Sequence, residues 1–100
     1  MAGKTTLNEL PPPPAALTDK NAHELFRAWI VGTGLQVSLQ PGFEDPSTWG
    51  LLLVDVARHV SRAYAAEGRF TEAEVMERIR TMWTAEVTSP TDQGKTERHG

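Results

Sequence analysis

The stretch LQVSLQPGFEDPSTWGLLLVDVARHVSRAYAAEG, residues 35–68, decides the fold of this chain. Its first six residues alternate strictly between apolar and polar side chains, which predicts a β-strand over residues 35–40. Pro41-Gly42 ends that strand. Asp45-Pro46 then supplies an N-cap side chain followed by a proline suited to the first helical position. We therefore expect a strand, a turn and a long helix, in that order.

The helix predicted after Asp45 carries an apolar stripe and ends at a glycine. Members of the stripe recur at the three- and four-residue spacing of an amphipathic helix: Trp49, Leu52, Leu53, Val56, Val60, Ala63 and Tyr64. At about 100° per residue they share one face of the helix. Gly68 supplies the left-handed residue that commonly ends a helix.

A second helix is predicted directly after this glycine. Thr71 and Glu74 have the spacing of a capping box, and Phe70 can pack on Val75 as a hydrophobic staple. An apolar face continues along this helix: Val75, Ile79, Met82, Trp83 and Val87. Ser89-Pro90 ends it, because the residue before a proline disfavours helical geometry.

The upstream segment HELFRAWIV, residues 23–31, supports two interpretations. Its aromatic and β-branched content favours a strand, whereas the spacing of Leu25, Ala28 and Trp29 also fits a short helix. The next residues favour the strand, because two strand-like runs joined by a few residues with glycine form a β-hairpin. We therefore interpret residues 32–34, GTG, as a hairpin turn and not as a phosphate-binding loop, which would need a helix after it.

The predicted fold is α+β: a two-stranded antiparallel β-hairpin followed by two antiparallel helices (ββαα), with disordered tails. The short connection from Gly68 to Phe70 makes the two helices antiparallel. Alternate strand residues should face one another across the hairpin and meet the first helix: Phe26, Ala28 and Ile30 opposite Leu35, Val37 or Leu39, against Trp49, Leu53 and Val56.

Both ends of the chain are predicted to lie outside the folded domain. Residues 1–20 form a disordered, proline-containing N-terminal arm, because the four prolines 11–14 favour extended polyproline conformation and exclude helix. Residues 89–100 form a disordered C-terminal tail, because they are polar and lack an apolar anchor. A single α+β domain at residues 22–88 remains. A domain of this size buries only about 60% of its unfolded surface and is marginal alone.

Charge and cysteine content exclude several classes of function. The formal net charge is −3, so no general attraction to nucleic acid or to an anionic membrane is expected. The longest apolar run, residues 49–54, is far shorter than the roughly 20 residues of a membrane helix, and we see no signal peptide. The chain has no cysteine, which fits a reducing cytoplasm. Without disulfides, we expect oligomerisation to supply the stability that a small core lacks.

Four charged residues of the first predicted helix form a candidate ligand-binding site: Asp55, Arg58, His59 and Arg62. An Asp–His pair at this spacing could hold one imidazole tautomer for general base work, and the arginines could bind a carboxylate or phosphate. The alternative is a solvated ion-pair network, because no motif places a nucleophile beside the histidine. We expect no catalytic residue, no cofactor and no metal site, since the histidines lack ligand spacing.

The same helix indicates a homodimer. Leu51 and Val54 lie roughly opposite its apolar stripe, so the first half of the helix is apolar on nearly all sides. A helix that faces solvent has a polar side instead. A lone hairpin also has two exposed edges. We therefore expect two copies to pair edge to edge in one four-stranded sheet, which also covers Leu51 and Val54 if the first helices of the two copies meet.

Two hypotheses of function follow from these observations. In the first, the chain is a small non-enzymatic dimeric module that binds another protein, with the N-terminal arm as a solvated tail or a docking segment. In the second, it binds a small anionic ligand, or is a minor enzyme, through the charged residues of the first helix. The second hypothesis requires those side chains to line one concave pocket.

Two motifs carry a family resemblance: residues 34–42, GLQVSLQPG, and residues 45–59, DPSTWGLLLVDVARH. Trp49-Gly50 with Asp55 and Arg58-His59 is the most specific part. Through these motifs the chain resembles, over roughly residues 23–85, a family of small bacterial proteins known as domain-of-unknown-function family 5076. The resemblance implies bacterial origin and cytoplasmic residence, and it implies no activity, ligand or catalytic residue.

Overall fold

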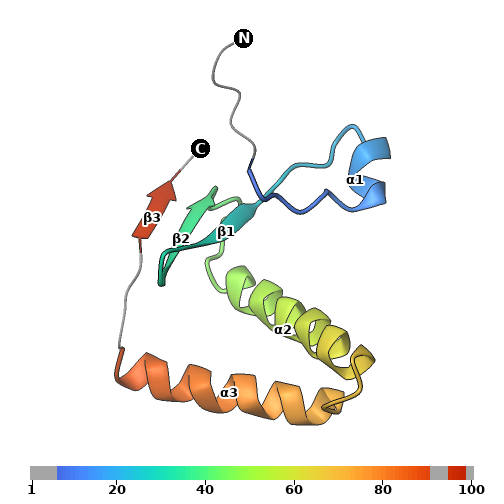
Figure 1. Ribbon diagram of the computed structural model, residues 1–100. Coiled ribbons are helices and arrows are strands. Elements are labelled where there is room, and N and C mark those ends of the chain that lie inside the picture. The colour runs from blue at the N-terminus through green and yellow to red at the C-terminus, as the bar shows by residue number, and fades with distance from the viewer. Residues whose placement is uncertain (1–6, 91–94, 99–100) are drawn as a thin grey trace.

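A computed structural model describes residues 7–90 and 95–98 of the chain, and it separates a small sheet from a pair of long helices (Figure 1). The elements in chain order are α1 (Pro14–Thr18), β1 (Phe26–Val31), β2 (Gly34–Leu39), α2 (Thr48–Ala66), α3 (Glu72–Thr88) and β3 (Lys95–Arg98). The predicted order of hairpin and two helices is confirmed.

The hairpin has the predicted register. Alternate residues face one another across the antiparallel pair: Phe26 and Leu39, Ala28 and Val37, Ile30 and Leu35. The turn between the strands is tight, and Gly32 has a φ of 65°, as the first central residue of a type II′ turn requires. A side chain at this position would be strained, so the glycine fixes the turn and with it the register.

Short elements also lie within the two segments predicted to be disordered. β3 pairs parallel with β2, which gives a three-stranded sheet of order β1-β2-β3. α1 begins at Pro14, so the expectation that all four prolines exclude helix is wrong for the last of them. A proline fits the first helical position, where its missing N–H has no intrahelical partner. Residues 1–6, 91–94 and 99–100 lie outside the described part, and disorder there stays a prediction.

The start of α2 differs from the prediction by two residues. Asp45 caps the segment as expected, because its Oδ1 accepts a hydrogen bond of 3.0 Å from the backbone N–H of Ser47. This bond holds the pKa of the Asp45 carboxyl below its usual value. The residues after Asp45 first form a tighter turn with i→i+3 bonds, such as Thr48 N–H to Asp45 carbonyl, and the α-helix begins at Thr48.

The connection between α2 and α3 follows the predicted signals closely. Gly68 ends α2 with a φ of 89°. The capping box is present, because Glu74 N–H donates to Thr71 Oγ1 and Thr71 N–H donates to Glu74 Oε1, each at 3.1 Å. Near this turn the helices pack closely, with Ser61 of α2 and Val75 of α3 buried.

Removing the cap should destabilise α3 measurably. We expect Thr71→Ala to lower the free energy of unfolding by about 1 kcal/mol, because the backbone N–H of Glu74 loses the Thr71 Oγ1 as its acceptor. Urea denaturation at one fixed protein concentration measures the change. Thr84→Ala is the matched control, since Thr84 lies on the same helix and its hydroxyl donates to the Arg80 carbonyl without capping anything. Equal effects of the two substitutions would contradict this role of Thr71.

Trp49 joins the sheet to the helices. Its ring lies edge-on to Phe26 of β1, with centroids 6.1 Å apart, and to Phe43, with centroids 5.7 Å apart. Its indole N–H also donates to the Pro41 carbonyl at 2.7 Å. The expected contact of the hairpin with Trp49 is therefore confirmed.

The wider packing predicted between the hairpin and α2 is wrong. Among the described elements, strands pack on strands and α2 packs on α3, but no strand lies against a helix along its length. Leu53 and Val56, which were expected beneath the hairpin, are exposed. The segment from Pro41 to Ser47 directs α2 away from the sheet (Figure 1), so the hairpin covers Trp49 but not Leu53 or Val56.

Candidate functional site

The most distinctive feature of this molecule is its very small core. Within the described residues, Val75, 6% exposed, is the buried apolar side chain, and Ser61, 1% exposed, is the buried polar one. Large apolar side chains are exposed on α1, on both strands of the hairpin and on both long helices. A surface of this kind is unusual for a soluble monomer, in which apolar patches are small.

The surface area and the dimensions describe an open molecule. The chain exposes 8850 Å², whereas a folded monomer of 11.0 kDa exposes about 5,600 Å². The radius of gyration is 16.2 Å, against roughly 13 Å for a compact domain of 100 residues. The whole chain, with its exposed N-terminal segment, is therefore less compact than a globular monomer of its mass.

A group of exposed apolar side chains lies where α2 and α3 are farthest apart. The helices meet at the Gly68 turn and diverge from it, so that the start of α2 and the end of α3 form the open end of a V (Figure 1). We name the exposed residues at this end the open-end cluster: Leu51 and Val54 of α2 with Trp83 and Val87 of α3. The sequence predicted the two α2 members as interface residues.

The closed end of the V contains a hollow of about 400 Å³. Val60 and Tyr64 of α2 line it together with Phe70 and Ile79. Tyr64 lies edge-on to Phe70 at 6.2 Å, and the guanidinium of Arg78 lies 4.9 Å from the centre of the Phe70 ring. This arrangement stabilises the closed end of the V through aromatic and cation–π contacts.

The four charged residues proposed as a ligand site lie on an exposed face of α2. Arg58 and Asp55 form an ion pair of 3.6 Å, and both side chains are more than half exposed. His59 and Arg62 are also exposed. Exposed ion pairs of this kind contribute little to stability. The structure thus places the four residues on one solvated face, and ligand binding by them stays a prediction.

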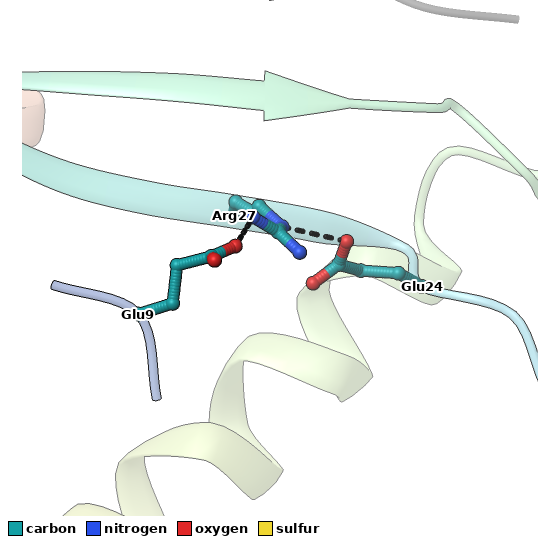
Figure 2. A network of polar contacts seen from close by, with 3 residues as sticks. All are labelled: Glu9, Glu24 and Arg27. Carbon is teal, nitrogen blue, oxygen red and sulfur yellow. Dashed lines mark hydrogen bonds and ion pairs between the residues drawn. The ribbon is translucent and has the colours of Figure 1, made fainter. Parts of the chain in front are cut away.

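An ion-pair network holds the N-terminal segment against the sheet. Figure 2 shows Arg27 of β1 between two carboxylates, Glu24 next to the strand and Glu9 of the N-terminal segment. The Arg27 Nε donates to Glu24 Oε1 at 2.7 Å, and its Nη1 donates to Glu9 Oε2. Glu24 and then Glu9 raise the pKa of Arg27, which keeps the guanidinium charged. Residues 8–10 therefore lie beside β1, an outer strand of the sheet.

Loss of this arginine should release the arm. In Arg27→Ala, we expect residues 8–10 to exchange their amide protons faster, while exchange in α2 and α3 is unchanged. Hydrogen exchange followed by mass spectrometry measures both. Arg80→Ala is the control, because Arg80 pairs with Glu77 on α3, on an element that the arm does not contact. Unchanged exchange of residues 8–10 in Arg27→Ala would show that the ion pair does not hold the arm.

In the part of the chain that the structure describes, no group of three or more His, Cys, Asp or Glu residues could hold a metal ion. No described helix is long and apolar enough to cross a membrane. The features that sequence reasoning missed are instead those of packing: the buried Ser61 and the α3 half of the open-end cluster. The apolar face predicted for α3 contained the relevant residues, but the divergence of the helices could not be inferred from it.

Comparison with known proteins gives a family and a structural relative. The family model DUF5076, a domain of unknown function, matches residues 9–91, which confirms the resemblance found in the sequence. A solved structure from the photosynthetic bacterium Rhodopseudomonas palustrus CGA009 is 44% identical in sequence and covers 100% of both chains, with a TM-score of 0.71. That protein carries the provisional name of a pyruvate dehydrogenase. No curated protein matches the chain.

Proposed function

We propose that the chain, which belongs to the DUF5076 family, is a small non-enzymatic module that works as a homodimer and binds another protein. One observation carries the proposal: the apolar residues of both helices are largely exposed in the single chain. Burying apolar surface is the dominant favourable term in folding, and this chain has almost no core of its own among its described residues. A second copy is the simplest way to supply one.

The means of stabilising a small domain that depend on cysteine are absent from this sequence. Disulfides and thiolate metal sites require cysteine, and the chain has none. The chain is acidic overall, with a formal net charge of −3, which disfavours nucleic acid or an anionic membrane as the covering surface. These facts support a protein partner, and the first such partner is a second copy.

The sheet offers a second place for pairing, as its sequence suggested. β2 lies between β1 and β3, so the two edges of the sheet belong to the outer strands. The N-terminal arm lies beside β1 through the Glu9–Arg27 ion pair. The opposite edge belongs to β3, so the sheet and the helices are both candidate dimer contacts.

Affinity capture from the native cell tests the protein-binding part of the proposal. A tagged chain should recover both its own untagged copy and a specific partner, identified by mass spectrometry after chemical cross-linking. A chain that begins at residue 21 shows whether the arm takes part. Recovery of the chain's own copy and no other protein, with the full-length and the shortened chain alike, would contradict an interaction role.

Small-ligand binding at Asp55, Arg58, His59 and Arg62 is the alternative, and the exposed position of all four side chains does not favour it. A thermal-shift screen against phosphates and carboxylic acids tests it. We expect no ligand to raise the melting temperature of the wild type more than that of His59→Ala. A ligand that does so would support the alternative.

The provisional name of the structural relative suggests a dehydrogenase, and the described residues do not fit that activity. A dehydrogenase that acts on pyruvate needs a site that holds its cofactors. The described part of this chain has no cluster of metal ligands, and its perturbed ionisable groups are exposed caps and ion pairs. We therefore derive no catalytic step for it.

We also propose that the chain works in the bacterial cytoplasm. The bacterial source of the relative at 44% identity supports a bacterial origin. The absence of cysteine from the sequence fits a reducing compartment. Fractionation of the native cell followed by immunoblotting tests the compartment, and recovery in the periplasm or the medium would contradict it.

A further inference from the structure

We propose that the hollow at the closed end of the V binds a small monocarboxylate with an apolar tail. The carboxylate pairs with Arg78, and the tail lies between α2 and α3 against the side chains that line the hollow. The hollow is present in the single chain, so this ligand needs no second copy, and the site is separate from the charged face of α2 that carries Asp55 and Arg58.

The wall of the hollow is mostly apolar. Val60 and Tyr64 of α2 line it together with Val75, Ile79 and Met82 of α3. Its volume of about 400 Å³ falls within the range of small-molecule sites. At about 30 Å³ for each water-sized group, such a space holds a hydrocarbon chain of on the order of ten carbons. The part of the ligand inside the hollow is therefore a hydrocarbon tail.

Arg78 is the charged side chain in this lining. Its guanidinium lies 4.9 Å from the centre of the Phe70 ring, and this stacking holds the planar group beside the hollow. Arg69 lies 5.5 Å from the same ring but is not part of the lining. A guanidinium binds a carboxylate through two parallel hydrogen bonds, and one guanidinium balances its single negative charge. A carboxylate is therefore the polar group that suits this position.

Nearby acidic side chains leave Arg78 without an ion pair among the described residues. Glu74 has the i,i+4 spacing for a pair with Arg78, but its Oε1 accepts the backbone N–H of Thr71 in the capping box. Glu77 pairs with Arg80 instead. The local sequence thus places a cation beside an apolar hollow and commits the neighbouring carboxylates elsewhere. A ligand carboxylate would supply the missing partner.

Titration of the full-length chain with decanoate, followed by methyl NMR, tests the site. The methyl signals of Val60 and Ile79 should shift and saturate. Those of Leu10 and Ile30, which are exposed outside the hollow, should not respond. Affinity should rise about threefold with each methylene added between hexanoate and decanoate. Decanol has the same tail without the charge, and it should bind at least about tenfold more weakly.

Arg78→Gln tests the polar half of the site. Glutamine keeps part of the aliphatic stem and removes the charge, so decanoate should bind about tenfold more weakly or less tightly still. Arg62→Gln is the matched control, because Arg62 is also exposed and has no ion pair among the described residues. It lies about 200° around α2 from Val60, away from the hollow, and its loss should leave the affinity unchanged. Circular dichroism checks that both variants are folded.

Three results would overturn the inference: no saturable shift at Val60 and Ile79, equal affinities of the wild type and Arg78→Gln, or decanol bound as tightly as decanoate. A fourth would overturn it while supporting the proposed homodimer. In that case the same methyl signals shift when the ligand-free chain is diluted and do not respond to decanoate, because a second copy fills the hollow. Saturable binding of decanoate to a chain that is monomeric would leave the site in place and contradict only the homodimer.

Discussion

Replacing Trp49 by alanine should lower the free energy of unfolding by about 3 kcal/mol, the largest loss we expect from a single substitution in this chain. The indole lies against the rings of Phe26 and Phe43, and its N–H donates to the Pro41 carbonyl. Alanine removes all three contacts at the point where the sheet meets α2. Urea denaturation at a fixed protein concentration measures the loss.

Trp49→Phe separates the two kinds of contact. Phenylalanine keeps an aromatic ring for Phe26 and Phe43 but cannot donate to the Pro41 carbonyl, so we expect a loss of about 1 kcal/mol. Hydrogen exchange gives a second readout, because Trp49→Ala should accelerate exchange in β1 and β2 more than in α3. A loss below about 1 kcal/mol for Trp49→Ala would show that the sheet is held to the helices by other contacts.

Enlarging Ser61 should have the second-largest effect. Its side chain is buried between α2 and α3, and its hydroxyl donates to the Ala57 carbonyl at 2.8 Å. In Ser61→Leu the larger side chain forces the helices apart, and overpacking of this kind costs about 1–3 kcal/mol. We expect a loss near the upper end of that range, with weaker dimerisation as well, because the angle of the V changes.

Ser61→Ala is the matched control. It keeps the small volume, and the hydroxyl it removes had been bonded within its own helix. Alanine is also the better helix former, so we expect a change in the free energy of unfolding within about 0.5 kcal/mol. If Ser61→Leu were as stable as Ser61→Ala, the helices would not pack as closely at this point as the structure shows.

The parts of the fold that could be predicted depend on local signals. The strict alternation of residues 35–40 sets the hairpin register, and Gly32 supplies the positive φ of its turn. Gly68 and the Thr71–Glu74 capping box mark the two sides of the helical turn. Each of these features needs only residues close in the chain, so the sequence contains enough information to place it.

The parts that could not be predicted depend on packing between distant residues. β3 pairs with β2 although the two are separated by both long helices, and its short polar sequence shows no apolar alternation. The apolar stripe of α2 indicated a buried face and was predicted to lie beneath the hairpin, whereas the structure leaves Leu53 and Val56 exposed. The buried position of Ser61 likewise depends on the closeness of α3, which helical periodicity does not report.

Only the α2 residues of the candidate interface were predicted from the sequence. Leu51 and Val54 were identified because they lie opposite the stripe of their own helix. Trp83 and Val87 were predicted to continue the apolar face of the second helix, and the divergence of the helices leaves both exposed. The angle between α2 and α3 decides which of their residues share one surface. Side-chain volumes at the closed end of the V set that angle.

The mass of the wild-type chain in solution tests the central claim most directly. Sedimentation equilibrium from about one to about a hundred micromolar should give twice the chain mass of 11.0 kDa over most of this range, with dissociation only on dilution. A second copy would then cover the apolar surface that the single chain exposes. A mass of 11.0 kDa at tens of micromolar, from a chain that is folded by circular dichroism, would contradict the account.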